Sequence, residues 1–187
     1  MNSKIRCGWV NPANELYVRY HDEEWGKPVY DDAILFEFLI LEWAQAGLSW
    51  EIILKRRAGY KKVFCDFDVK KCSELSDEEL EIILKDEGII RNRLKVFSVR
   101  KNALVFLQIQ QQFGSFSKYL WNFVWGKVVK NNPKSLKEIQ ASSELSDTLS
   151  KDLKKRGMSF VGSTIIYAYL QAVGVVDDHT QDCFCKK

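Results

Sequence analysis

The sequence contains little that would interrupt regular structure, with only three prolines and ten glycines among its 187 residues. It has no internal repeat, no low-complexity tract and no linker, which excludes a solenoid or a disordered chain. A long uncharged apolar run is also missing, because Glu37 and Glu42 interrupt the longest apolar stretch, AILFEFLILEW. The N-terminal MNSKIRCGWV has no signal-peptide core. We therefore expect a soluble, cytoplasmic protein with no membrane partner.

A strong excess of one charge is missing too, since 28 basic and 25 acidic side chains leave a net charge of +3. This balance permits a nucleic-acid partner but does not indicate one. The five cysteines are not needed as a disulfide scaffold, because a chain of this length removes roughly 70% of its unfolded surface from water on folding. The composition, 46% apolar, predicts one monomeric domain over residues 1–187.

Apolar residues recur with a helical period from residue 32 to residue 174, whereas strict apolar–polar alternation is nearly absent. The pattern predicts an all-α fold that needs no strand. Residues 1–30 and 175–187 carry aromatic, Cys and His residues but little helical period. Capping residues and glycines mark the ends of the expected helices. In the first half of the chain, helices are predicted from Asp31 and Asp32 to about Ala46, over 50–64 after the cap Ser49, and from the Ser76–Glu79 capping box to Gly88. In the second half they are predicted from the basic link IIRNR to Gly114, over FSKYLWNFVW, from Leu145 to Arg156 and from Ser163 to Gly174.

The string LKKRGMSFVGSTIIYAYLQAVG, within residues 151–174, has the layout of two helices joined by a short hairpin. Gly157 suits a left-handed position after the first helix, and Gly162 lets another backbone approach the start of the second. Such a helix start binds a phosphate through unpaired N–H groups and its positive dipole end. An ordinary helical hairpin with a solvated basic face explains the string equally well. Four basic residues just upstream would add attraction for a polyanion: Lys151, Lys154, Lys155 and Arg156.

Glu42 lies where the helical pattern predicts a core residue. It falls in the centre of an apolar face that includes Leu35, Phe38, Leu39 and Ala46, whereas Glu37 projects roughly opposite, toward solvent. Burial of an unpaired carboxylate costs several kcal/mol or forces protonation, so a functional site explains such a residue better than packing does. Two alternatives stay open: an arginine partner for Glu42, or a face rotated by one residue.

Aromatic residues are close to Glu42 in sequence or precede it. A carboxylate surrounded by aromatic faces suits a flat, amine-bearing and preferably cationic ligand. Taken singly, each of these aromatics is more often a core residue than part of a ligand site. The candidates are Trp9, Tyr17, Tyr20, Trp25, Trp43 and Trp50.

The two histidines both lie in the irregular ends of the chain. His179 and Cys183 are four residues apart, a spacing that places both side chains on one side of a turn. With Cys7 and His21 they form a Cys2His2 set, which suits one structural, tetrahedral zinc ion joining the two ends. The alternatives are Cys185 as a rival sulfur ligand, a Cys7–Cys183 disulfide, which a reducing cytosol disfavours, or unrelated free thiols.

Several ordered motifs give the chain a resemblance to the 3-methyladenine DNA glycosylase I family. They are RCGWV, LYVRYHDEEWG, LEWAQAGLSW, EGIIRNRLKV, LKKRGMSFVGSTIIYAYLQAVG and DHTQDC, which together span nearly the whole chain. The resemblance implies an all-α, helix-hairpin-helix fold and an enzyme of base-excision repair. Such an enzyme flips a damaged base out of double-stranded alkylated DNA and hydrolyses its N-glycosidic bond, with free 3-methyladenine as the product.

The resemblance also implies roles for individual residues. Zinc ligands fall on Cys7, His21, His179 and Cys183. The base-recognising and catalytic carboxylate falls on Glu42, and base-binding aromatics fall on Trp9, Tyr17, Tyr20, Trp25 and Trp50. The DNA-binding hairpin falls on Lys154, Lys155, Gly157, Phe160, Gly162, Ser163 and Thr164.

Three features bear on how closely the chain follows the family pattern. Trp43 and Ala44 stand where small and amide residues are expected, so Trp43 puts the width of the pocket in question, whereas Gln45 matches the family. Asp177 stands where Asn is usual. Thr164 occupies the position at which lyase-type relatives carry a Schiff-base lysine, which implies hydrolysis without strand cleavage. A bifunctional glycosylase/lyase and a zinc-stabilised DNA-binding module without chemistry are the competing hypotheses.

Overall fold

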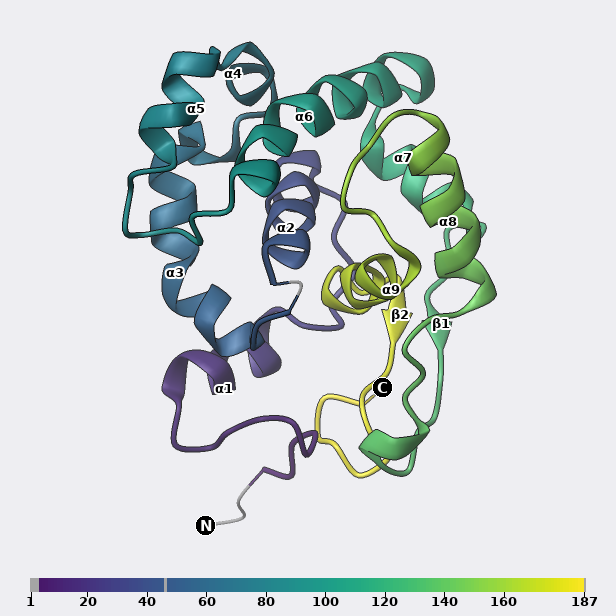
Figure 1. Cartoon of the computed structure of the whole chain (residues 1–187). Helices are drawn as coiled ribbons and strands as arrows, with labels where there is room; N and C mark the ends of the chain where they lie inside the picture. The colour runs from purple at the N-terminus through teal and green to yellow at the C-terminus, as the bar shows by residue number, and fades with distance from the viewer. Residues whose placement is uncertain (1–3, 46, 187) are drawn as a thin grey trace.

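The computed structural model describes residues 4–45 and 47–186, and most of them are helical (Figure 1). This confirms the expected helical architecture. No helix in the described ranges is long and apolar enough to cross a membrane. The elements are α1 (Glu15–Glu23), α2 (Asp32–Gln45), α3 (Trp50–Val63), η1 (Cys65–Phe67), α4 (Val69–Glu74), α5 (Asp77–Ile83), α6 (Arg93–Phe113), α7 (Phe116–Asn122), β1 (Val129–Lys130), η2 (Leu136–Glu138), α8 (Glu144–Lys155), α9 (Ser163–Ala172) and β2 (Val176–Asp177).

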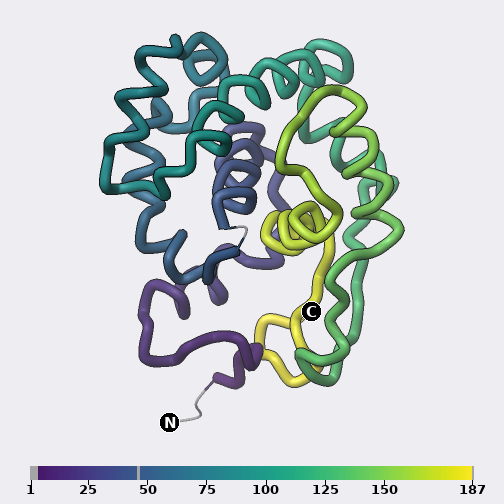
Figure 2. Tube along the Cα trace, in the orientation of Figure 1, coloured from purple at the N-terminus to yellow at the C-terminus, as the bar shows by residue number. Residues whose placement is uncertain are grey.

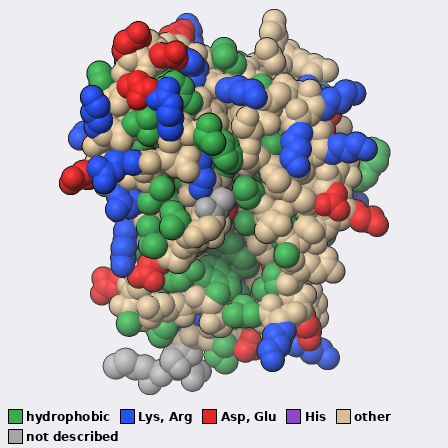
Figure 3. Space-filling model, viewed as in Figure 1, with side chains coloured by type: hydrophobic (Ala, Val, Ile, Leu, Met, Phe, Trp, Pro, Cys, Tyr) green, Lys and Arg blue, Asp and Glu red, His purple; other side chains and the backbone are tan. Residues whose placement is uncertain are grey.

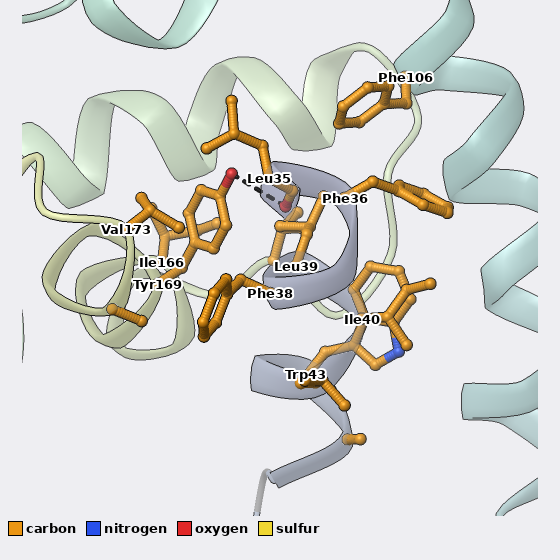
Figure 4. Close-up of a cluster of buried hydrophobic side chains, with 14 of the residues drawn as sticks. Leu35, Phe36, Phe38, Leu39, Ile40, Trp43, Phe106, Ile166, Tyr169 and Val173 are labelled. Atoms are coloured by element: carbon orange, nitrogen blue, oxygen red, sulfur yellow. Dashed lines mark hydrogen bonds between the residues drawn. The ribbon is translucent and has the colours of Figure 1, made fainter. Parts of the chain in front are cut away.

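Helix α2 lies in the middle of the molecule and contacts α3, α6, α7 and α9. Its sequence is apolar on nearly every side, so residues 38–44 are all buried. The prediction of a single apolar face was therefore too narrow, because Phe36 and Ile40 are buried as well. Figure 4 shows the packing, in which the Tyr169 hydroxyl of α9 donates a hydrogen bond of 3.2 Å to the Leu35 carbonyl oxygen.

The prediction of little regular structure in the ends of the chain was wrong for two segments. Helix α1 begins after Asn14, whose side-chain oxygen accepts a hydrogen bond from the backbone N–H of Tyr17. A pair of parallel strands is also present, with Val129 opposite Val176. Each strand has two residues, which is too short for an alternating pattern to reveal it.

Several helix ends also differ from the predicted ones. Helix α5 ends at Ile83 rather than Gly88, and α9 ends at Ala172 rather than Gly174. The capping box of Ser76 and Glu79 is confirmed. Asp31 accepts hydrogen bonds from the first N–H groups of α2, whereas the predicted second cap, Asp32, instead accepts those of Phe116 and Ser117 at the start of α7.

The two ends of the chain lie side by side at one end of the molecule (Figure 2). The backbone N–H of Phe184 donates to the carbonyl oxygen of Ile5 over 2.9 Å. The N–H of Thr180 donates to the sulfur of Cys7 over 3.4 Å. Segments more than 170 residues apart in sequence are thus in direct contact.

Candidate functional site

A cavity of about 330 Å³ opens on one face of the molecule. Figure 3 shows a hollow with apolar side chains in the middle of this face. Helix α2 contributes Glu42, and the N-terminal segment and α1 contribute most of the aromatics. The remaining wall comes from the start of α3, from η2 and from α9. The structure brings all the predicted base-binding residues together here. The lining is Trp9, Tyr17, Tyr20, Trp25, Glu42, Gln45, Trp50, Leu136, Ile139, Ala168 and Gln171.

Glu42 is buried in the wall of this cavity, with only 4% of its surface exposed. No hydrogen bond or ion pair to its carboxylate is formed within residues 4–45 and 47–186. Burial alone raises the pKa of Glu42 to about 8, because a low-dielectric surrounding disfavours the charged form. Burial therefore favours the protonated form of this side chain.

Arg57 lies over the ring of Phe38 on α2 but pairs with carboxylates other than Glu42. Arg57 of α3 forms ion pairs of 2.7 Å with Glu24 and with Glu37. Glu37 was predicted to face solvent, but only 15% of its side chain is exposed. The prediction failed because α2 is surrounded by other helices, so that its polar face meets α3 rather than water.

The aromatic rings that line the cavity also pack against one another. The ring centroids of Tyr20 and Trp50 are 5.4 Å apart, and Trp9 lies 5.2 Å from Tyr17 and 5.1 Å from Trp25. Burial and the nearby Glu42 both raise the pKa of Tyr20, so its hydroxyl stays a hydrogen-bond donor. Rings arranged in this way offer both apolar faces and hydroxyl groups to a flat ligand.

Trp43 does not line the cavity. It is 1% exposed and packs on the other side of α2, next to Tyr60, Phe64 and Lys95. Its bulk therefore does not narrow the cavity. Ala44 lies on the same side.

Sequence reasoning missed Gln171, and it noted Gln45 only as a match to the family. The side-chain nitrogen of Gln45 donates to the carbonyl oxygen of Leu48 over 2.8 Å, and that of Gln171 donates to Asp178 over 2.6 Å. Gln171 follows Ala168 by three residues on α9. This helical spacing was the only signal that pointed to it.

Near this cavity, a His/Cys cluster joins the two ends of the chain. The ligand atoms of His21, His179, Cys183 and Cys185 all lie within 4.8 Å of one another. Cys7 is not part of this group, although it is 1% exposed and close enough for Cys183 to raise its pKa. Three of the four predicted ligands are thus brought together with Cys185, the rival sulfur ligand, while Cys7 lies beside His21 and Thr180.

The two histidines of the cluster are oriented alike by carboxylates. His21 Nδ1 is 2.8 Å from Asp22 Oδ1, and His179 Nδ1 is 2.8 Å from Asp177 Oδ1. The Nε2 of His21 lies 3.4 Å from Cys183 Sγ and 3.5 Å from the backbone nitrogen of Cys7, whereas the buried Nε2 of His179 has no hydrogen-bond partner in the described chain. An imidazole held by a carboxylate at one nitrogen with the other nitrogen free is typical of a metal ligand. The donor set fits Zn²⁺.

The hairpin between α8 and α9 is braced from two sides. The backbone of Ser159 exchanges two hydrogen bonds, of 2.8 and 2.9 Å, with the side chain of Asn102 on α6. Ser150 donates to the carbonyl oxygen of Val161 over 2.6 Å. Gly157 has a φ of 103°, which agrees with the predicted left-handed position. These contacts fix the loop that precedes α9.

Side chains at the hairpin differ in whether they are available to a ligand. Lys154, Lys155 and Thr164 are exposed, and around Gly162 no described atom lies within 4 Å of the place that a Cβ would take. The Ser163 hydroxyl, in contrast, bonds to Ser146 over 2.8 Å.

The expectation that Arg156 adds to the basic surface was wrong. It pairs with Asp152 at 2.6 Å and lies over the rings of Phe113 and Tyr119. The guanidinium of Arg156 therefore packs against residues of α6, α7 and α8 instead of extending freely into solvent.

Comparison with known proteins places the whole chain in one family. A family model described as methyladenine glycosylase matches residues 9–186. The DNA-3-methyladenine glycosylase of Haemophilus influenzae is 42% identical over 181 residues, which cover 97% of each chain. The DNA-3-methyladenine glycosylase 1 of Escherichia coli is 44% identical over 180 residues, covering 96% of each chain.

Solved structures agree with the sequence comparisons. A crystal structure of 3-methyladenine DNA glycosylase I matches with a TM-score of 0.95 and 43% identity, over 98% of this chain and 100% of the other. The Staphylococcus aureus enzyme, solved to explain 3-methyladenine recognition, matches with a TM-score of 0.93 and 34% identity, over 97% and 96% of the two chains. The chain therefore belongs to the methyladenine glycosylase family of DNA glycosylases.

Proposed function

We propose that this protein removes 3-methyladenine from double-stranded alkylated DNA by hydrolysis of the N-glycosidic bond and leaves an abasic site. One observation carries the proposal: a buried carboxylate, Glu42, shares a cavity with a group of aromatic rings and has no cationic partner in the described chain. The relatives named above act on the same damaged base by name, and one related structure contains 3-methyladenine.

The chemistry of the substrate explains why such a site suffices. An adenine methylated at N3 carries a positive charge while it is attached to the sugar, and it leaves as a neutral base. The bond is thus already weakened, and no strong general acid is required. The protein has to extract the base, recognise it and exclude competing bases. Water then attacks the sugar carbon as the base departs.

Glu42 changes its protonation state when a cationic base enters. The empty cavity holds it neutral at pH 7, since burial raises its pKa to about 8. A positive charge within a few ångströms favours the carboxylate and lowers that pKa again. The charged Glu42 then accepts a hydrogen bond from the exocyclic amine of the base. The rings of Tyr20 and Trp50, which contact each other at 5.4 Å, form one aromatic wall against the base. Neutral adenine lacks the charge that makes ionisation of Glu42 favourable.

We infer that the hairpin between α8 and α9 binds the DNA backbone. Open space at Gly162 and the start of α9 suit a phosphate. Lys154 and Lys155 lie exposed at the end of α8 and add charge attraction. These contacts hold the duplex while the damaged base leaves the stack. In this proposal α8, the hairpin and α9 together act as a DNA-binding helix-hairpin-helix element.

This role predicts how binding depends on salt. Changing Lys154 and Lys155 together to Gln should weaken binding to an abasic duplex about equally for all sequences. The slope of log K against log salt concentration should fall by about 1 for each phosphate that is no longer neutralised. Fluorescence anisotropy of a labelled abasic duplex at several salt concentrations measures this slope. Lys137, exposed in η2, provides the control, since its change to Gln should leave the slope alone. An unchanged slope in the double variant would contradict the proposed backbone binding.

We further propose that the His/Cys cluster holds one structural zinc ion. His21, His179 and Cys183 would supply three ligands, with Cys7 as the fourth ligand in keeping with the sequence prediction. Zinc would supply no chemistry to the reaction and would tie residues 4–30 to residues 175–186. We expect the enzyme to act as a monomer, because one chain supplies the cavity, the cluster and the hairpin.

The direct test is release of base from methylated duplex DNA, followed by chromatography. Purified protein should release free 3-methyladenine and leave intact strands with abasic sites. Binding of DNA without any release would instead support a module without chemistry. Borohydride added to the same reaction should trap no covalent adduct, because Thr164 offers no amine. A trapped adduct would show a bifunctional glycosylase/lyase and overturn the proposal of simple hydrolysis.

A further inference from the structure

Gln171 lies in the cavity wall, but its amide nitrogen is bound outside the cavity. Its Nε2 donates a hydrogen bond of 2.6 Å to Oδ2 of Asp178. Asp178 is absent from the lining of the base cavity and lies instead beside a second cavity of about 460 Å³, together with Tyr167 and Asn131. The side chain of Gln171 therefore reaches from one cavity toward the other.

Asp178 is 1% exposed and accepts hydrogen bonds from three side chains. The Tyr167 hydroxyl donates over 2.7 Å, and the amide nitrogens of Asn131 and Gln171 donate over 2.6 Å each. A carboxylate only accepts hydrogen bonds. The group of Gln171 that faces it must be the NH2 group, because a turned amide would place two oxygens against each other. The carboxylate of Asp178 therefore determines which end of the Gln171 amide faces it.

We propose that Asp178 is a positioning residue that makes Gln171 a hydrogen-bond acceptor toward the bound base, and that this pair selects bases that carry an amine rather than a carbonyl oxygen at C6. With Nε2 directed at Asp178, no hydrogen bond to the carbonyl oxygen Oε1 is formed within the described residues, so we infer that this acceptor faces the cavity that Gln171 lines. An adenine-type base carries an amine at the position where a guanine-type base carries a carbonyl oxygen. An acceptor in the wall favours the first and repels the second. The inference rests on the proposed glycosylase function and adds the source of its selectivity.

Gln45 strengthens this selectivity from another part of the wall. Its Nε2 donates to the Leu48 carbonyl oxygen, so its Oε1 is left over in the same way. Glu42, Gln45 and Gln171 all line the cavity, and in this proposal each presents an acceptor oxygen to the base. A site rich in acceptors discriminates strongly, since the wrong base leaves buried polar groups unpaired.

The test compares two bases in one reaction. Duplex DNA that contains both 3-methyladenine and 3-methylguanine is treated with each variant, and the ratio of kcat/KM for the two bases is measured from their initial rates of release. The ratio does not depend on how much of a variant is folded. Gln171→Met, which keeps length and loses both polar atoms, should lower the ratio about tenfold.

Asp178→Asn should lower the ratio by a similar factor, because an amide at 178 no longer dictates which side of Gln171 faces it. Tyr167→Phe is the matched control. It removes another hydrogen bond of Asp178 but keeps that of Gln171, so the ratio should stay within twofold of wild type. An unchanged ratio in Gln171→Met would overturn the inference. A lowered ratio in Gln171→Met together with an unchanged ratio in Asp178→Asn would overturn the positioning role of Asp178. Wild-type protein that releases neither base overturns the proposed function itself, and the inference with it.

Discussion

Replacing Glu42 with Gln should reduce the release of 3-methyladenine by a factor of roughly 100 to 1,000 and at the same time make the folded protein more stable. The amide keeps the size and one acceptor of the carboxylate but cannot become negative when the cationic base arrives. It also avoids the free energy that the folded protein spends on keeping an isolated carboxylate in a buried position. Loss of activity with gain of stability marks a residue kept for function.

The stability effect has a defined pH dependence. The folded-state pKa of Glu42 is raised from 4.5 to about 8, so the folded state holds this proton more tightly than the unfolded state does. The resulting stabilisation is complete below pH 4.5, is lost as pH rises toward 8, and stays lost above that. At pH 9 the variant should therefore exceed wild type by roughly 3–5 kcal/mol. The difference should vanish near pH 4.5.

Denaturant unfolding at these two pH values measures the difference, and Glu37→Gln is the matched control. Glu37 lies on the same helix but pairs with Arg57 outside the cavity, so its change should keep base release and lower stability. A Glu42→Gln variant that releases base at the wild-type rate would show that the carboxylate does not recognise the substrate. If Glu42→Gln and wild type had the same free energy of unfolding at both pH values, the carboxylate of Glu42 would not be held in its neutral form.

Removal of the metal should have the second large effect. Structural zinc contributes about 10–16 kcal/mol in small domains. Even a third of that would lower the Tm of a chain of this size by roughly 10 °C or more. His179→Ala should remove a ligand, and a strong chelator should give the same shift in the wild-type protein. Elemental analysis should find one zinc ion per chain in the wild type and less in the variant.

The fourth ligand can be identified with a pair of cysteine variants. Cys7→Ser should lose zinc and stability, whereas Cys185→Ser should retain both. The reverse result would assign Cys185, which lies within the cluster, as the ligand. A zinc-free protein that melts at the wild-type temperature would exclude any structural role for a metal here.

The sequence predicted the helices wherever one face is apolar and a capping residue marks the start. The capping box at Ser76 and the glycine after α6 are examples. It did not predict α1 or α4, because both helices are short, and the aromatic residues of α1 face a cavity rather than a continuous core. Only the caps Asn14 and Asp68 would have indicated them.

The candidate site shows the same division between local and distant information. Glu42 could be found because a charge interrupts an apolar pattern. The partners of Arg57 and the orientation of Gln171 could not, because each depends on residues from another helix. Trp43 seemed relevant by its position beside Glu42, yet successive helical residues point in different directions. The unusual Asp177 acquires a reason only in three dimensions, where it binds the ring of His179.

The contact between the two ends of the chain also determines when during synthesis the enzyme can work. Trp9 and Tyr17 leave the ribosome long before Ala168 and Gln171, and His179 and Cys183 of the cluster follow still later. A growing chain therefore has no complete base cavity, however well its middle helices have folded. Activity can begin only once residues 168–183 have emerged and packed against residues 5–25.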